Sequence, residues 1–143
     1  MGMYTELNLG IRLKTETPEE VIDVIKFMAN RYEEDTFNVK TLPPHPLFST
    51  SRWAIMLRCD SYYFDSLPHV SFEYDDIADC WFLTCVSNLK NYSNEIEHFL
   101  DWIAPHVDTE GFAGYRRYEE NYHPSLIYFN RGKVSYISIG ETQ

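Results

Sequence analysis

Residues 7–29 read LNLGIRLKTETPEEVIDVIKFMA, and this stretch decides the fold. Apolar residues occupy every second position from Leu7 to Leu13, which is typical of a half-buried strand. Residues 17–20 (TPEE) then start a helix, with threonine as the cap, proline at the first helical position and glutamate at the third. The later apolar residues recur at spacings of three and four, which predicts a helix of about 13 residues with one buried face. A strand followed by an amphipathic helix is the first unit of the fold.

The rest of the chain is predicted to contain further strands and one more helix. Ser93 precedes a second amphipathic pattern that ends before Pro105, which indicates a helix. Residues 130–133 (NRGK) provide a tight turn, because glycine adopts the positive φ that such turns need. Alternating or continuous apolar runs predict strands at residues 53–59, 62–64, 70–74, 80–88, 111–118, 126–129 and 134–139.

Two halves of the chain, residues 4–75 and 80–140, are similar to each other. Arg52-Trp53 aligns with Arg117-Tyr118 at an offset of 117 − 52 = 65 residues, and Phe64 aligns with Phe129 at the same offset. The similarity predicts a tandem β-α-β-β-β repeat, and chance similarity among short amphipathic strands is the alternative. We expect an α+β fold in two layers, with a largely antiparallel sheet, two helices on one face and the opposite face uncovered.

Length and charge define the class of protein. The 143 residues carry 12 Lys+Arg and 22 Asp+Glu, a formal net charge of −10, and 44% are hydrophobic. A domain of this size buries roughly 68–70% of its unfolded surface, so we expect one domain over residues 1–143. No apolar run approaches the ~18 residues of a membrane span, and the first residues lack the regions of a signal peptide. We therefore expect a cytoplasmic protein without a membrane partner, and the acidic charge argues against binding to a nucleic-acid backbone.

Neither the cysteines nor the carboxylates form a recognisable metal or redox motif. The three cysteines, Cys59, Cys80 and Cys85, lack the spacing of a zinc or redox site, and we interpret the last two as small hydrophobic residues. The acidic residues at positions 73–79 could offer oxygen ligands, but they lack the alternation and the glycine of a calcium loop. The sequence predicts no metal and no cofactor.

The strongest local indication of a binding site is Tyr115-Arg116-Arg117-Tyr118. In a strand Tyr115 and Arg117 share one face, and Arg116 and Tyr118 share the other. A guanidinium beside an aromatic ring suits a base, a phosphate or a carboxylate. A sheet surface held by cross-strand aromatic contacts and ion pairs is the structural alternative. The candidate binding residues are Tyr115, Arg116, Arg117, Tyr118, Tyr122, His123, Arg52 and Trp53.

Catalysis is less strongly indicated than binding. Serine, histidine and aspartate are present, but no nucleophile elbow, glycine-rich phosphate loop or HExxH motif occurs, so no catalytic residue is predicted. Eleven tyrosines and three tryptophans are residue types enriched at binding hot spots. We expect a non-enzymatic binding protein whose acidic, tyrosine-rich surface engages a protein partner with a basic patch. The alternatives are a binder of a small anionic ligand or nucleotide through the Arg/Tyr residues and, ranked below both, a small hydrolase.

Two further features bear on partners. The strand at residues 134–139 carries no charge, which makes it either a central strand or a dimer edge, and we expect a homodimer. The loop at residues 37–51 is long for a compact domain, and such loops are often functional.

Residues 17–25 (TPEEVIDVI) and 87–93 (SNLKNYS) resemble segments of small, uncharacterised, acidic bacterial and prophage-type proteins. The resemblance implies a bacterial or phage setting. For a phage-borne protein, it implies an inhibitor of a host factor.

Overall fold

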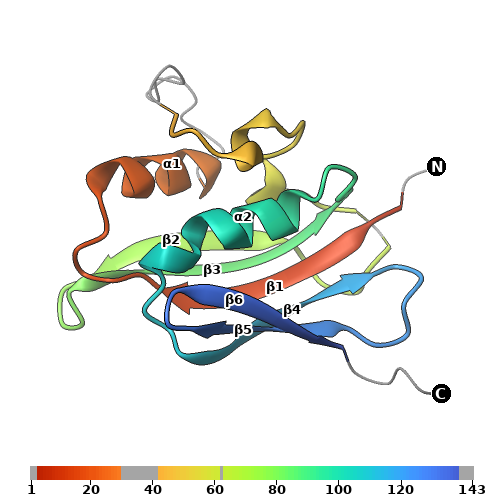
Figure 1. Ribbon diagram of the computed structural model, residues 1–143. Helices are drawn as coiled ribbons and strands as arrows, with labels where there is room; N and C mark the ends of the chain where they lie inside the picture. Colours follow the sequence, from red (N-terminus) through yellow and green to blue (C-terminus); the bar gives the residue numbers. More distant parts are fainter. Residues whose placement is uncertain (1–2, 30–41, 62, 139–143) are drawn as a thin grey trace.

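The computed structural model describes residues 3–29, 42–61 and 63–138, and its architecture is α+β (Figure 1). Within these ranges one antiparallel sheet of six strands packs against two α-helices, as the sequence predicts. None of the helices described is long and apolar enough to cross a lipid bilayer. The helices are α1 (Glu19–Ala29), α2 (Glu95–Ile103) and the short 3-10 helices η2 (Pro46–Ser49), η3 (Met56–Arg58) and η4 (Ala104–His106). The strands are β1 (Thr5–Arg12), β2 (His69–Asp75), β3 (Cys80–Leu89), β4 (Gly111–Tyr118), β5 (Ser125–Asn130) and β6 (Lys133–Ser138).

β1 lies inside the sheet, whose strand order is β2-β3-β1-β4-β5-β6. It pairs antiparallel with β3 on one side and with β4 on the other. Leu7, Leu9 and Ile11 are buried, whereas Gly10 and Arg12 between and after them are exposed. The predicted half-buried strand is confirmed, and its apolar face marks the side on which the core lies.

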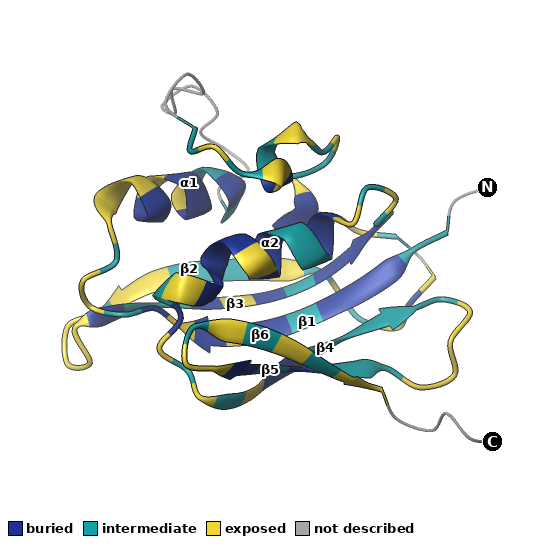
Figure 2. Cartoon of the chain, in the orientation of Figure 1, coloured by how far each residue is buried: buried dark blue, intermediate teal, exposed yellow. Residues whose placement is uncertain are grey.

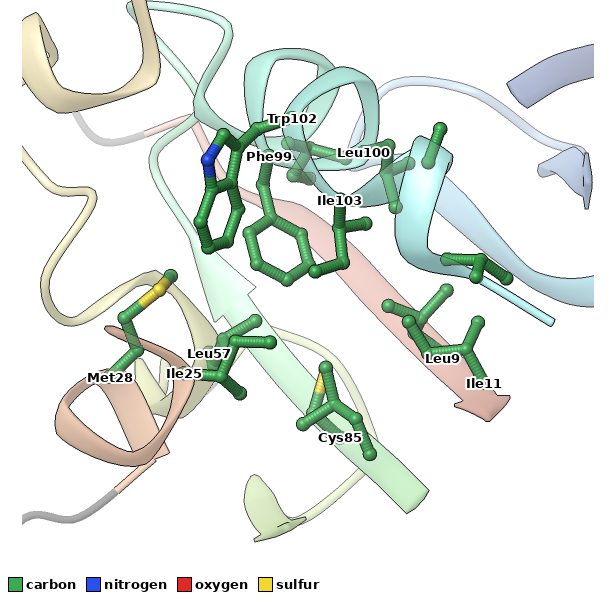
Figure 3. Close-up of a cluster of buried hydrophobic side chains, with 14 of the residues drawn as sticks. Leu9, Ile11, Ile25, Met28, Leu57, Cys85, Phe99, Leu100, Trp102 and Ile103 are labelled. Atoms are coloured by element: carbon green, nitrogen blue, oxygen red, sulfur yellow. The ribbon is translucent and has the colours of Figure 1, made fainter. Parts of the chain in front are cut away.

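Both helices lie on the same side of the sheet, which therefore has a covered face and an open face (Figures 1 and 2). In the core, side chains of α2 such as Phe99 and Ile103 lie above Leu9 and Ile11 of β1, with α1 beside them (Figure 3). Fully burying one such side chain stabilises the fold by about 1.5–3 kcal/mol. The helix–sheet interface therefore contributes to the stability of the fold through many such side chains.

The chain makes one kind of crossover twice. β1 and β2 are both antiparallel to β3 and are therefore parallel to each other, and α1 connects them. In the same way, β3 and β4 are both antiparallel to β1 and therefore parallel to each other, and α2 connects them. This β-α-β-β-α-β order is that of a split βαβ, ferredoxin-like arrangement, to which β5 and β6 add a hairpin. The predicted β-α-β-β-β repeat is not confirmed, because the unit that recurs is β-α-β.

The predicted strand at residues 53–59 is wrong. Trp53 lies in a turn, and η3 occupies Met56–Arg58. Met56 and Leu57 are adjacent and both fully buried, which a strand with one covered face does not allow, while Ile55 is exposed. Apolar residues in this segment fill the space beside α1 through a compact helical turn.

The alignments that supported the predicted repeat fail for the same reason. Trp53 in its turn does not correspond to Tyr118 in β4, and Phe64 in a bend does not correspond to Phe129 in β5. Of the predicted strand at residues 62–64, Tyr62 lies outside the described residues. Phe64 is nevertheless buried, because its loop folds back onto the sheet.

β4 contains the irregularity that bends the sheet. Its register with β5 shifts between Phe112 and Gly114, a β-bulge. A Cβ atom on Gly114 would lie 1.9 Å from the carbonyl oxygen of Asn8, so only glycine lets β4 approach β1 this closely. Beyond the bulge the sheet curves towards the helices until β6 contacts α2 and η4. The open face is the outer side of this curve.

Candidate functional site

The Tyr-Arg-Arg-Tyr motif lies in β4, and its side chains alternate between the two faces as predicted. Arg116 is opposite Leu7 in the register with β1, and therefore lies on the covered face with Tyr118. Arg117 is opposite Glu6, and therefore lies on the open face with Tyr115. The four residues contribute to two separate environments on opposite sides of one strand.

On the covered face, Arg116 and Tyr118 line a pocket of about 400 Å³ beside the start of α2. Its volume lies within the range of roughly 300–1,000 Å³ in which small molecules are bound. The lining includes none of the described residues of the loop at 37–51. The lining residues are Met3, Thr5, Asn91, Tyr92, Glu97, Arg116, Tyr118, Asn121 and Ser125.

Arg116 is held in this pocket from two sides. Its Nη1 atom donates to Glu97 Oε2 in an ion pair, and its guanidinium lies 3.8 Å from the centroid of the Tyr136 ring. Asn91 Nδ2 donates to Glu97 Oε1 at 2.9 Å and fixes the carboxylate in turn. Burial raises the pKa of Tyr136 to about 12, although the charge on Arg116 acts to lower it. The guanidinium is preoriented, and its charge is balanced by Glu97.

On the open face, Arg117 belongs to a polar cluster, which we call the Glu6 cluster, of Glu6, Ser66, Asn88 and Arg117. Arg117 Nη2 donates to Glu6 Oε1 at 3.0 Å, and Ser66 Oγ donates to Glu6 Oε2 at 2.7 Å. Phe64 lies over the guanidinium, with 4.9 Å between Cζ and the ring centroid. The side-chain nitrogen and oxygen of Asn88, and Arg117 Nε, are buried and have no hydrogen-bond partner among the described residues. The loop that carries Phe64 and Ser66 closes this cluster.

Next to the Glu6 cluster, a row of side chains crosses the open face from β3 to β6. Successive register pairs connect Val86, Asn8, Tyr115, Leu126 and Ile137. Burial, followed by the charge of Glu6, raises the pKa of Tyr115 above its usual range. This open-face row contains no charged side chain.

Two aromatic residues extend the open-face row along β4 and β5. Phe112 and Tyr128 are register partners, and their rings meet edge to face with centroids 5.8 Å apart. Phe112 is 56% exposed, and Ile137 at the end of the row is 49% exposed. We call the row together with Phe112 and Tyr128 the open-face strip.

Four carboxylates lie at the ends of β4, near the open-face strip, and the Glu6 carboxylate lies beside Tyr115 of the strip. Asp108 and Glu110 precede the strand, and Glu119 and Glu120 follow it. Of the tyrosines in the described strands, Tyr115 and Tyr128 lie on the open face, whereas Tyr74, Tyr118 and Tyr136 lie on the covered face. The strip itself therefore carries no charge, with Asn8 as its one amide side chain, and carboxylates lie at both ends of β4 beside it.

None of the other predicted binding residues lines the pocket. Tyr122 is exposed and stacks edge to face on His123, with ring centroids 4.9 Å apart. Trp53 packs against Phe27, at 5.9 Å between centroids. Arg52 lies over the ring of Tyr92, which lines the pocket on the covered face. The structure brings Arg52 close to Arg116 and Tyr118 but places Trp53 at the core.

The long loop predicted as functional is partly a packing element. Residues 37–41 lie outside the described residues. Phe48 of η2 meets Trp53 and Trp102 edge to face, with centroids 4.9 Å and 5.4 Å away. The described part of the loop therefore covers α2 with aromatic side chains.

Sequence reasoning missed the partners that make the pocket. Asn91 accepts a hydrogen bond from the backbone N of Ile96 at 2.8 Å and donates to Glu97, so it connects the start of α2 to Arg116. Thr5 and Ser125 face the same side as Arg116 in neighbouring strands. In the sequence, these residues are marked by the alternation that assigns them to one face of the sheet. That alternation does not distinguish a residue that lines a pocket from one that packs against its neighbours.

Metal and thiol chemistry have little support in the described residues. No group of three or more metal-ligating side chains occurs there. Asp75 Oδ1 accepts hydrogen bonds from the backbone N of Ile77 and of Ala78, so this part of the acidic segment stabilises the β2–β3 turn. Burial raises the pKa of the Cys85 thiol to about 12, which keeps it protonated and unreactive at neutral pH.

The chain matches no protein-family model, no curated protein and no solved structure. The ferredoxin-like arrangement alone does not identify a function either, because common folds carry many unrelated ones. The open-face strip and the pocket on the covered face are the two regions that bear on function.

Proposed function

We propose that this protein is a binding protein whose open-face strip receives a protein partner. The observation that carries the proposal is the row of neutral side chains across the uncovered face, extended by Phe112 and Tyr128. Contiguous exposed apolar groups with a polar surround are typical of protein interaction sites.

The residue types in the strip favour a protein partner over a small molecule. Aromatic side chains bury a large area at low entropic cost and dominate the energetics of many interfaces. Phe112 is 56% exposed, so a partner would remove much of its surface from water. The strip lies on the outer side of the curved sheet, which suits an extended partner surface better than a compact ligand.

Charge indicates what the partner carries. The chain has a formal net charge of −10, and carboxylates flank both ends of β4 around the neutral strip. Complementary potentials accelerate encounter and disfavour wrong partners. The proposed partner therefore has an apolar patch bordered by basic residues.

Capture from a bacterial lysate with wild-type protein and two matched variants tests this proposal. Phe112→Ser removes an aromatic group from the strip, whereas Ile77→Ser removes an apolar side chain, 96% exposed, from the turn between β2 and β3. Loss of a hot-spot residue costs about 2 kcal/mol or more, so we expect Phe112→Ser to retain at least about tenfold less of the partner. Ile77→Ser should retain as much partner as the wild type.

The salt dependence of the same capture tests the charge argument. At about 0.5 M salt exposed charges are screened beyond a few ångströms, so capture should weaken but not disappear. Retention of no protein at low salt, or equal loss in both variants, contradicts the proposal.

The pocket on the covered face supports a second candidate function, the binding of a small anionic ligand such as a nucleotide. Arg116 is preoriented by Tyr136 and Glu97, and Tyr118 lines the same cavity. Because Glu97 already balances the guanidinium, an anion must displace this carboxylate or bind the remaining donors. The charge balance makes this candidate weaker than the protein partner.

Thermal-shift measurements against a nucleotide panel test the pocket. A ligand that binds the folded state raises the melting temperature in a concentration-dependent way. The rise should vanish in Arg116→Gln and persist in Arg131→Gln, which removes the same charge at the tip of the β5–β6 hairpin. A flat response of the wild type across the panel contradicts this candidate.

A further inference from the structure

β6 forms one edge of the sheet, and its outer side offers backbone hydrogen-bonding groups. The β5–β6 turn has two residues, Arg131 with φ 53° and Gly132 with φ 77°, as in a type I′ hairpin. In such a hairpin the pair next to the turn, Asn130 and Lys133, exchanges both of its hydrogen bonds. Lys133, Ser135 and Ile137 therefore bond to β5. The alternate residues Val134, Tyr136 and Ser138 direct their N–H and C=O groups outwards.

Nothing among the described residues occupies these outward groups. No backbone hydrogen bond of the loops and caps in the described ranges involves residues 134–138. After Lys133 the strand has no charge, no proline and no bulge, so of the usual features that protect an exposed edge it has only its contacts with α2 and η4.

The opposite edge of the sheet has different chemistry. β2 carries Glu73 and Asp75 and begins at His69. Charged side chains on an edge strand disfavour pairing with another chain. Only one of the two edges is therefore suited to strand addition, so association through it stops at two copies.

We propose that β6 pairs antiparallel with β6 of a second copy, across a two-fold axis at Tyr136, to form one continuous sheet. In this register Val134 faces Ser138 of the second copy, and Tyr136 faces its own counterpart, so outward-directed backbone groups meet each other. Ile137 lies opposite Ser135, and residues 134–138 bring no charge to the contact. A register centred on Ser135 would place Lys133 opposite Ile137 and bury part of a charged side chain.

Self-pairing also fits the charge distribution and the open-face strip. Two copies that each carry a net charge of −10 repel, so contact is favoured along β6, which itself carries no carboxylate, although the charges of Glu97 and Asp101 in α2 act on Tyr136. Ile137 ends the open-face row, and pairing at β6 would join the rows of the two copies into one strip. Because salt screens the repulsion, the dimer should tighten as ionic strength rises.

Sedimentation of the full chain at micromolar concentration tests the proposal with three variants. Ile137→Lys introduces a charge into the contact, and Ser138→Pro removes an outward N–H that an isolated edge strand can spare. Ser71→Lys makes the matched change on the open face of the other edge strand, β2. We expect twice the 16.9 kDa of one chain for the wild type and for Ser71→Lys, and 16.9 kDa for the other two.

Circular dichroism establishes that each variant is folded, and Ile137→Lys, at an exposed position, decides the question if Ser138→Pro does not fold. A wild type of 16.9 kDa at all concentrations overturns the proposal, as does a dimer that survives Ile137→Lys or a species larger than two copies. The proposal is independent of the protein partner, because Phe112→Ser should reduce capture at least about tenfold and leave the dimer intact.

Discussion

Arg116 and Arg117 are neighbours in β4, yet they lie on opposite faces of the sheet and meet carboxylates of very different exposure. Arg116 pairs with Glu97, whose side chain is 33% exposed beside the pocket. Arg117 pairs with Glu6, whose side chain is 3% exposed beneath the loop of Phe64 and Ser66. A carboxylate that water can reach tolerates the loss of its partner, and a buried one does not. We therefore expect the Arg117–Glu6 pair to contribute more to stability than the Arg116–Glu97 pair.

Arg117→Met should have the largest effect. Methionine retains much of the side-chain volume but leaves the carboxylate of Glu6 buried without its cation. Breaking a buried pair from one side costs about 3 kcal/mol or more, because the remaining charge is uncompensated. Urea denaturation should show this loss as a lower midpoint at unchanged slope.

The double variant Glu6→Gln/Arg117→Met is the control, because it removes both charges. Its loss of stability should be smaller than the sum of the two single losses. If Arg117→Met alone lowered the free energy of unfolding by less than about 1 kcal/mol, the Arg117–Glu6 pair would contribute no more than an exposed ion pair. The difference between the two arginines would then be contradicted.

Asn88→Leu should act in the opposite direction. The Asn88 side chain is fully buried, and within the described part of the chain neither of its polar atoms has a hydrogen-bond partner. A buried, unsatisfied polar group costs about 1–3 kcal/mol, and leucine fills a similar volume without that cost. We expect a gain of about 1–2 kcal/mol in the free energy of unfolding. A destabilised Asn88→Leu variant would mean that the amide serves the Glu6 cluster through an interaction other than a direct hydrogen bond.

Ser66→Ala should have a smaller effect on the same side of the sheet. Its hydroxyl donates to Glu6 Oε2 at 2.7 Å and connects the loop to the sheet. Hydrogen bonds to charged groups contribute roughly 1.5–3 kcal/mol when intact, and the part-buried position favours the lower value. Ser61→Ala is the matched control, because Ser61 accepts a local hydrogen bond from Tyr63 N. A lower melting temperature for Ser61→Ala than for Ser66→Ala would contradict the role of Ser66 in connecting the loop to the sheet.

Arg116→Met should change stability by less than about 1 kcal/mol, since partly exposed ion pairs contribute little. Glu97 keeps its hydrogen bond from Asn91 when the guanidinium is removed. Equal losses in Arg116→Met and Arg117→Met would show that the two faces do not differ in the way the burial of their carboxylates indicates.

The sequence predicted that these two arginines lie on opposite faces of the sheet, but it did not predict their partners. Alternation in a strand is a local property, so placing Arg116 and Arg117 on opposite faces needs only the strand itself. Their carboxylates lie 19 and 111 residues away along the chain. Which of many carboxylates reaches each arginine depends on the strand order, and no local pattern gives that order.

The same distinction explains the rest of the fold. The alternation at Leu7 to Leu13 and the turn at residues 130–133 are short-range patterns, and both predictions are confirmed. Residues 53–59 are as apolar as a strand, but they form a turn and η3 because they fill space beside α1. Short apolar segments do not distinguish the two outcomes, since tertiary packing decides between them.

Tyr136→Phe should have the smallest effect, and only at high pH. The hydroxyl of Tyr136 has a pKa raised to about 12 by burial, against about 10 in the unfolded chain. Between these values the unfolded chain releases this proton and the folded protein retains it, so the tyrosine's contribution is present below pH ~10 and is lost as pH rises towards ~12. The wild type should therefore lose stability more steeply than Tyr136→Phe over this range. Below pH ~10 the difference in stability between the two proteins should stay constant. Parallel stability curves up to pH ~12 would mean that the ring under Arg116 is open to water in the folded state.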